Sequence, residues 1–135
     1  MPAKYDVTQY DRPSVTVDVL LFTVEKGELR ILLVKRNEAP FESSWALPGG
    51  FVHMNESLDE AATRELVEET GVKGLYLEQL YTFGNPKRDP RTRVITVTYM
   101  ALAAKAEWKL KSTGDANAAD FFSIDKLPKL AFDHA

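Results

Sequence analysis

The sequence predicts an α+β domain in which several β-strands surround one long helix. The first observation is a set of apolar or alternating segments, at residues 14–24, 29–36 and 94–104, whose pattern is typical of strands. The second is a single stretch, residues 58–70, whose apolar side chains recur with helical spacing. The third is length, because 135 residues fit one domain (residues 1–135) with a sizeable core.

The first half of the chain predicts a β-hairpin. Residues 1–13 are polar and end in a proline, and within them residues 4–10 are expected to form a short extra strand or an arm. Residues 14–24 alternate at first and then become fully apolar, which is typical of a strand buried on both faces. A turn is predicted at residues 25–28, so residues 29–36 are the returning strand.

The predicted helix has recognisable signals at both ends. Ser57 is a good N-cap, and Glu60 three residues later completes a capping box. Gly71 stands where a left-handed residue would end the helix, which is therefore expected to cover residues 58–70. At 100° per residue, one stripe faces the core and is formed by Leu58, Ala62, Leu66 and Thr70.

The other segments are shorter or less regular. A loop at residues 37–44 precedes a short apolar segment, residues 45–50, which a proline and two glycines interrupt. The segments after the helix are, in order, a strand at 75–83, a loop of turn formers and basic residues at 84–93, the clearest strand at 94–104, a polar stretch at 105–119, a last short strand at 120–124 and a helical turn at 125–127.

Composition excludes several classes of protein. The net charge of −3 argues against a general nucleic-acid binder, which would carry a basic face. The chain has no cysteine, so disulfides, thiolate catalysis and zinc–thiolate sites are excluded. No apolar run approaches the roughly 20 residues of a membrane span, and the N-terminus lacks a signal-peptide pattern. A cytoplasmic protein is therefore expected.

Three glutamates stand close together on the predicted helix. Glu65, Glu68 and Glu69 are spaced i, i+3 and i+4, so their carboxylates cluster along one edge of the core-facing stripe. Like charges at this spacing destabilise an isolated helix by roughly 0.2–0.5 kcal/mol per pair. The alternative is a solvated acidic face, but the cluster at the margin of the core favours a bound cation.

The stretch that contains these glutamates resembles the Nudix box of the Nudix hydrolase family. Chance agreement at seven fixed residue types would occur in about one window in 10⁸ or 10⁹. The resemblance implies the Nudix fold, an α/β/α sandwich around a mixed β-sheet. The matching positions are Gly50, Glu56, Arg64, Glu65, Leu66, Glu68, Glu69, Gly71 and Val72.

The resemblance also implies the metal chemistry of the site. Glu65, Glu68 and Glu69 correspond to the metal ligands, together with the Gly50 carbonyl, and oxygen ligands of this kind suit Mg²⁺ or Mn²⁺. Glu56 is expected to be an outer ligand or a partner of Arg64. Ion pairs from Arg64 are expected to orient the glutamates.

The general base has two candidates. In the family it often comes from the helix or from a carboxylate in a loop before the last strand. Glu65 is the helix candidate, and Asp115 occupies such a loop position, although a plain Gly-Asp turn is the alternative for it. The expected catalytic residues are therefore Glu65, Glu69, Arg64 and Asp115.

The substrate is expected to be a nucleoside diphosphate derivative. The segment Pro86-Lys87-Arg88-Asp89-Pro90-Arg91 resembles a loop of ADP-ribose pyrophosphatases and of the Nudix domain of NAD-metabolism regulators. This loop puts four cations, Lys87, Arg88, Arg91 and Arg93, next to the expected metal site. Arg88 and Arg93 are the loop residues chosen to bind phosphate, with Arg36 at a strand end as a further contact. The alternative is a basic surface loop. His53 and His134 have no visible partners in the sequence and are expected to be structural or solvent-facing. Trp108 is expected to pack in the core or at a dimer contact, and the alternative is stacking on a base.

Two functions fit these resemblances. The first is hydrolysis of ADP-ribose, and the second is an ADP-ribose-sensing domain of a transcriptional regulator. DNA binding by this chain itself is not expected, whereas a homodimer is. The Nudix fold commonly closes with a helix near the point where residue 135 stands. Either the domain does without that helix, or a C-terminal helix or another domain follows residue 135; Asp133, a good N-cap, favours the second alternative.

Overall fold

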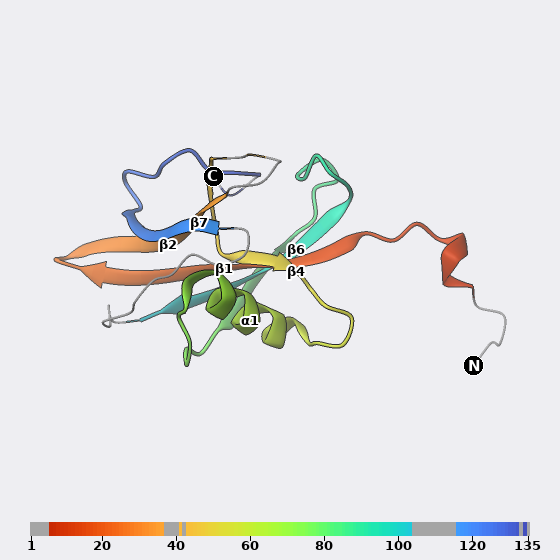
Figure 1. Ribbon diagram of the computed structural model, residues 1–135, viewed down its shortest axis with the longest axis horizontal. Helices are drawn as coiled ribbons and strands as arrows, with labels where there is room; N and C mark the ends of the chain where they lie inside the picture. Colours follow the sequence, from red (N-terminus) through yellow and green to blue (C-terminus); the bar gives the residue numbers. More distant parts are fainter. Residues whose placement is uncertain (1–5, 37–40, 42, 104–115, 133, 135) are drawn as a thin grey trace.

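The computed structural model describes residues 6–36, 41, 43–103, 116–132 and 134. In these residues, seven strands and one α-helix follow a short 3₁₀ helix. Figure 1 shows how they are arranged. In chain order the elements are the 3₁₀ helix Val7–Gln9, β1 Ser14–Glu25, β2 Glu28–Arg36, β3 Trp45–Ala46, β4 Gly49–Phe51, α1 Leu58–Thr70, β5 Glu78–Phe83, β6 Val94–Leu102 and β7 Ala116–Ser123.

The strands form a single mixed sheet, so the α+β prediction is confirmed. The main path of the sheet runs β3-β2-β1-β6-β5, with β4 paired to β1 and β7 paired to β2. Strands β1 and β6 are parallel, and every other pair in this part of the chain is antiparallel.

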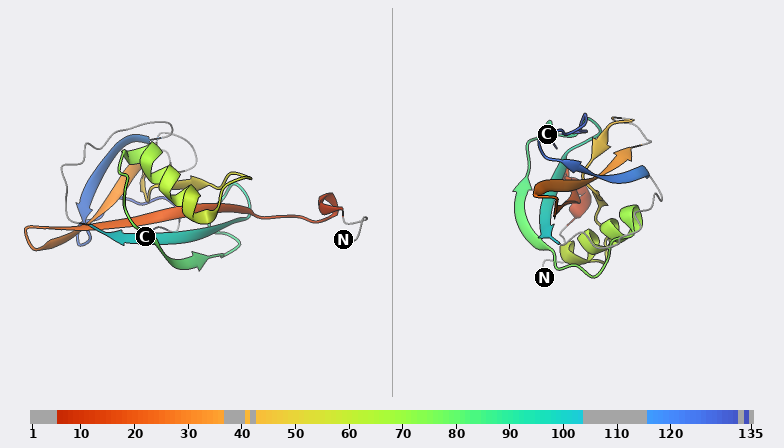
Figure 2. Two further views of the ribbon diagram at one scale, coloured as in Figure 1. Left: turned by 90° about the horizontal axis from the view of Figure 1, so that it is seen from below. Right: turned by 90° about the vertical axis from the view of Figure 1, so that its left-hand side faces the viewer.

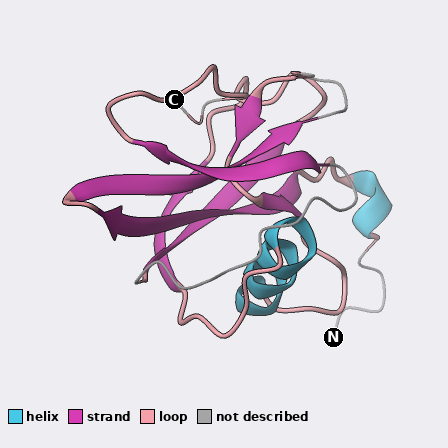
Figure 3. Ribbon diagram, turned by 60° about the vertical axis from the view of Figure 1, so that its left-hand side comes forward, coloured by secondary structure: helices cyan, strands magenta, loops and turns pink. Residues whose placement is uncertain are grey.

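Strand β1 changes partner along one of its edges, and the sheet forks there. Its first half pairs with β4, through the register Thr16 to Phe51 and Asp18 to Gly49. Its second half pairs with β2, beginning at Phe22. Farther along, β2 pairs with β3 on the edge that β1 has left, while β7 lies along the other edge of β2 from Arg30 to Arg36 (Figure 3). The fork creates a space beside the first half of β1.

The β1–β2 hairpin turns tightly at two residues with positive φ. Lys26 has φ 54° and Gly27 has φ 75°, the combination that a type I′ turn requires. The turn was predicted from the sequence. It lies at one end of the sheet, at the left of Figure 1.

Helix α1 has the bounds and both caps that the sequence predicts. The Glu60 N–H donates to Ser57 Oγ at 3.1 Å, and the Ser57 N–H donates to the Glu60 carboxylate at 2.8 Å. Gly71 ends the helix with φ 81° in the left-handed region. A cap of this kind stabilises a helix by about 1 kcal/mol.

One face of the sheet carries α1, as the left-hand view of Figure 2 shows. The core between them is apolar, and full burial of a leucine such as Leu66 contributes about 1.5–3 kcal/mol. The hydroxyl of Tyr99 donates to Asp59 at 2.6 Å and ties the start of the helix to β6. The buried core residues include Val17, Val19, Leu21, Leu32, Ala61, Ala62, Leu66, Val72 and Tyr99.

Several predicted segments differ from the structure. Residues 45–50, predicted only as an apolar segment, contain β3 and β4, because two- and three-residue strands are too short to show a period. The predicted strand 75–83 begins only at Glu78. The last strand is β7, which starts earlier than the predicted segment 120–124 because pairing with β2 extends it through alanines of weak strand propensity.

One prediction near the C-terminus needs correction. Residues 125–127, predicted as a helical turn, contain a turn and a bend and no helix, with Pro128 following. Of the two alternatives for the N-terminal segment, the described part agrees with the arm, which is exposed and contains a 3₁₀ helix and no strand. None of the described helices is long and apolar enough to cross a membrane.

Close packing of β4 against β1 predicts that Gly49→Ala destabilises the protein. The added methyl group would overlap the Val17 carbonyl and lie 2.6 Å from Asp18 Oδ1. Overpacking of this kind costs about 2 kcal/mol or more, measurable as a lower denaturant midpoint. Gly84→Ala is the matched control, since a methyl there meets no atom within 4 Å. Equal midpoints for the two variants would contradict the packing described here.

Candidate active site

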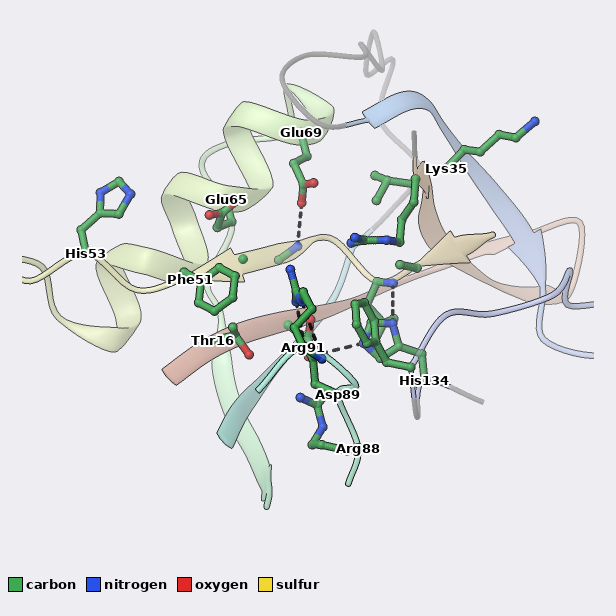
Figure 4. Close-up of a pocket in the computed structure, with 18 residues that line it drawn as sticks. Thr16, Lys35, Phe51, His53, Glu65, Glu69, Arg88, Asp89, Arg91 and His134 are labelled. Carbon is green, nitrogen blue, oxygen red and sulfur yellow. Dashed lines mark hydrogen bonds and ion pairs between the residues drawn. The ribbon is translucent and has the colours of Figure 1, made fainter. Parts of the chain in front are cut away.

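A cavity of about 260 Å³ occupies the fork of the sheet. Its walls come from β1, β2, the β3–β4 segment, helix α1, the loop between β5 and β6, and the C-terminal segment. Figure 4 shows Glu65 and Glu69 on one side of the cavity and Arg88, Asp89 and Arg91 on the opposite side. An acidic wall therefore faces a basic wall.

The acidic wall is built by the inner edge of α1. Glu65 and Glu69 line the cavity, whereas the Glu68 side chain is 58% exposed. The Gly49 N–H donates to Glu69 Oε1 at 2.7 Å, so the helix is tied directly to β4. A carboxylate held by a backbone N–H keeps a fixed orientation.

Gly50 allows Glu65 to approach the backbone of β4. A methyl group at this position would lie 2.7 Å from the Glu65 carboxyl carbon and closer still to one of its oxygens. Glycine is the residue type that permits such a close approach. Gly50 therefore brings the backbone of β4 close to the carboxylate of Glu65.

Arg64 lies outside the cavity wall and forms ion pairs with three glutamates, Glu56, Glu65 and Glu68. Its guanidinium donates to both oxygens of Glu56, at 2.9 and 2.6 Å, and to the Phe51 carbonyl at 3.1 Å. It also donates to Glu65 at 2.9 Å and to Glu68 at 3.2 Å. The ion pairs expected of Arg64 are present, and its effect on activity stays a prediction.

These contacts shift the pKa of Glu56 strongly. The Arg64 guanidinium, together with the His53 N–H, lowers the pKa of Glu56 from 4.5 to about 2. The bond to Glu56 in turn raises the pKa of Arg64. The pair is therefore ionised throughout the physiological pH range.

The donor set fits a hard divalent cation in chemistry and in place. Glu65, Glu69 and the Gly50 backbone line the same cavity, and carboxylate and carbonyl oxygens are the ligands that Mg²⁺ or Mn²⁺ prefers. Among the residues that the structure describes, no three acidic or histidine side chains converge as a finished metal site. The reason is visible in the contacts, since Glu65 and Glu68 turn toward Arg64 and Glu69 toward Gly49.

The basic wall consists of a rigid arginine–aspartate motif. Arg88 and Asp89 are buried although they lie in a loop. Arg91 donates to both oxygens of Asp89, at 3.1 and 2.7 Å, and this bond pair raises the pKa of Arg91. Arg36, at the end of β2, also lines the cavity.

Among the predicted site residues that the structure describes, those outside the cavity wall are Glu56, Arg64, Glu68 and Arg93. Arg93 is exposed, and its guanidinium donates to the Gly84 carbonyl at 2.5 Å across the base of the loop. Asp115 lies outside the described residues, as does Trp108.

Sequence reasoning missed Asp18 and His134, which meet at the inner end of the cavity. Asp18 accepts from the Thr96 hydroxyl at 2.7 Å, and its other neighbour is His134 Nε2 at 3.6 Å. The Leu47 N–H donates to His134 Nδ1 at 3.1 Å, and the imidazole is 6% exposed. His134 is therefore structural, one of the two alternatives expected for it, and its partners are residues that the sequence alone did not indicate. The one signal for this pair was a lone carboxylate in an apolar strand.

Comparisons with known proteins agree with the geometry. The model of the NUDIX domain matches residues 12–135. The chain is 40% identical over 136 residues to the ADPR responsive transcriptional repressor NtrR of Acinetobacter baylyi, covering 98% of this chain and 54% of that protein. It is 43% identical over 125 residues to the ADP-ribose pyrophosphatase of Methanocaldococcus jannaschii, covering 93% of this chain and 70% of that one.

A solved structure shows the same fold. The NUDIX domain of Shewanella oneidensis NrtR, in a cocrystal with ADP ribose, matches with a TM-score of 0.89 and 37% identity over 98% of this chain and 88% of that chain. The expected Nudix fold is thereby confirmed. The chain spans about half the length of the repressor.

The lowered pKa of Glu56 predicts a specific loss of stability in acid. Because the pKa is lower in the folded than in the unfolded protein, the Arg64–Glu56 pair stabilises the fold above pH 4.5 and loses its effect as the pH falls toward 2. The difference in unfolding free energy between wild type and Glu56→Gln should therefore shrink over this window. Denaturant titrations with a chelator present measure it, and a pH-independent difference would refute the assignment.

Proposed function

Because the chain belongs to the Nudix family, we propose that it is a divalent-metal-dependent hydrolase that cleaves the diphosphate of ADP-ribose or a similar nucleoside diphosphate derivative. The products would be AMP and a sugar phosphate. The observation that carries this proposal is one cavity with carboxylates on one wall and arginines on the other. A diphosphate needs both, since its negative charge must be matched by cations on either side.

The acidic wall supplies the ligands for the metal. Glu65 and Glu69, with the Gly50 carbonyl, would hold it from inside the cavity, and Glu68 would join them by turning from Arg64. A bound Mg²⁺ would neutralise charge on the phosphate oxygens and lower the pKa of a water molecule. Arg64 limits the freedom of the glutamates, a role supported by its contacts with Glu56 and Glu65.

The proton of the attacking water has two candidate acceptors. Glu65 lies in the cavity wall, and its carboxylate is oriented by Arg64 at 2.9 Å. Asp115 remains the other candidate. Either carboxylate would act as a general base only if its oxygen comes within hydrogen-bond reach of the water.

The basic wall would bind the phosphates. Arg88 and Arg36 line the cavity and are the proposed phosphate contacts. Arg93 would support the loop through its hydrogen bond to the Gly84 carbonyl, and it would have to break that bond to reach the substrate. Asp89 keeps Arg91 in a fixed orientation, which lowers the entropy cost of binding.

A second function is favoured by the repressor relative. The 40% identity to an ADPR responsive repressor supports a role as the ligand-sensing part of a longer regulator. The complete set of box glutamates supports the hydrolase instead, because sensing alone does not require them. Weak hydrolysis together with ADP-ribose-dependent release of DNA by the longer protein would favour the regulator. A homodimer and a cytoplasmic location remain predictions.

Hydrolysis of ADP-ribose is the decisive test. With Mg²⁺ present, the products should be AMP and ribose 5-phosphate, detected by chromatography. In ¹⁸O water the label should enter one of the two phosphates, because water attacks phosphorus. Label on a sugar carbon, or no reaction with a panel of nucleoside diphosphate derivatives, would refute the proposal.

Glu69→Gln tests whether Glu69 is a metal ligand in this reaction. Its amide oxygen can still accept from the Gly49 N–H, so the fold should persist while the cation loses a charged ligand. Turnover should fall by about 10²-fold or more at saturating Mg²⁺. Turnover near that of the wild type would remove Glu69 from the metal site.

Arg88→Ala should mainly raise KM for ADP-ribose. A charge-assisted contact to phosphate contributes about 1.5–3 kcal/mol, which corresponds to an increase in KM of about 10-fold or more. Lys87→Ala is the control, since Lys87 is exposed in the same loop and lies outside the cavity wall. The same KM for both variants would make the loop a surface feature only.

A further inference from the structure

Phe132, in the C-terminal segment, lies in the cavity wall with a backbone conformation that is unfavourable for an aromatic residue. Its φ is 52°, in the left-handed region that side chains with a Cβ rarely adopt. Strain of this kind persists only where the surrounding structure enforces it, and it concentrates at functional sites. The position of the ring in the cavity wall therefore points to a role at the site.

The segment around Phe132 is fastened on both sides. The Trp45 N–H donates to the Lys129 carbonyl at 2.9 Å, and the Ala131 N–H donates to the Trp45 carbonyl at 2.8 Å. On the other side, the buried ring of His134 accepts from the Leu47 N–H. Strand β3 and the segment after it therefore hold the ring of Phe132 at the cavity.

The ring of Phe132 contacts two arginines that come from different parts of the chain. The guanidinium carbon of Arg36 lies 4.9 Å from the ring centroid, and that of Arg91 lies 5.4 Å from it. Arg91 also lies 5.1 Å from the centroid of Phe51. Both distances are within the range of cation–π attraction, which fixes a guanidinium without neutralising its charge.

Two cations beside one ring repel each other, and a bound anion would offset that repulsion. Asp89 already offsets part of the charge of Arg91, and it does so from a buried position. A diphosphate carries more than one negative charge and can accept hydrogen bonds from two guanidiniums at once. The arrangement therefore suits a ligand with two linked phosphoryl groups.

We propose that Phe132 is a positioning residue that holds Arg36 and Arg91 as a pair of diphosphate-binding guanidiniums. This inference rests on the proposed function only for the identity of the natural ligand. It explains how Arg91 is held beside Arg36 and gives the C-terminal segment a part in ligand binding. The ring acts through the arginines, so its effect should be independent of the base and sugar attached to the diphosphate.

The test is calorimetric binding of inorganic pyrophosphate and of ADP-ribose without divalent cations, which separates this inference from hydrolysis. Phe132→Leu keeps an apolar side chain but removes the ring, and it should weaken the binding of both ligands by a similar factor of about 10. Phe132→Tyr keeps the ring and should restore affinity to within about 2-fold of the wild type. In an Arg36→Ala/Arg91→Ala background, Phe132→Leu should cause almost no further loss, as expected when residues act as one unit.

Three results would overturn the inference. The first is a wild-type protein that does not bind pyrophosphate at millimolar concentration. The second is a loss of affinity in Phe132→Leu that is confined to ADP-ribose, which would mean that the ring stacks on the base. The third is a full further loss of affinity from Phe132→Leu in the Arg36→Ala/Arg91→Ala background. Phe132→Gly serves as a second variant if Phe132→Leu unfolds, because glycine adopts this φ without strain. It should fold and still bind pyrophosphate about 10-fold more weakly.

Discussion

The close approach of β4 to both β1 and α1 is the constraint on which the site depends. Gly49 lies against the backbone of β1, and Gly50 lies against the carboxylate of Glu65, so this short strand of the sheet touches both its neighbouring strand and the helix. This spacing allows the Gly49 N–H to hold Glu69. A side chain at Gly49 would push β4 away from β1, and a side chain at Gly50 would displace the carboxylate of Glu65.

Electrostatics in the cavity are organised by charges that are already paired. Arg64 is held by Glu56 outside the acidic wall, and Arg91 is held by Asp89 within the basic wall. Each pair fixes the orientation of an arginine side chain but partly neutralises a charge that a ligand could use. A fixed orientation favours binding, because the hydrogen bonds of a planar guanidinium to phosphate are directional. The cavity therefore combines preorganised donors with carboxylates that can exchange their N–H partners for a cation.

The sequence predicted those parts of the fold that depend on local signals. The caps of α1, the hairpin turn and the long strands follow from capping residues, glycine placement and periodicity, all of which act over a few neighbouring residues. Strands β3 and β4 were missed because their pairing is set by β1 and β2 and not by their own composition. The same limit applies to the site. The glutamates and arginines were found through motifs, whereas the meeting of Asp18 with His134 and the ring of Phe132 with Arg36 depends on how the C-terminal segment returns to the sheet.

The forked pairing of β1 has a consequence for how such a chain can evolve. Side chains alternate between the two faces of a strand, so one inserted or deleted residue within β1 would exchange Asp18 at the cavity for the core residue Val17 and disrupt both at once. Changes of length are far better tolerated at the Lys26–Gly27 tip, where a methyl on the glycine would meet no atom within 4 Å. Related domains can therefore differ in length at the tip of the β1–β2 hairpin, whereas the alternation of side chains along β1 has to stay the same.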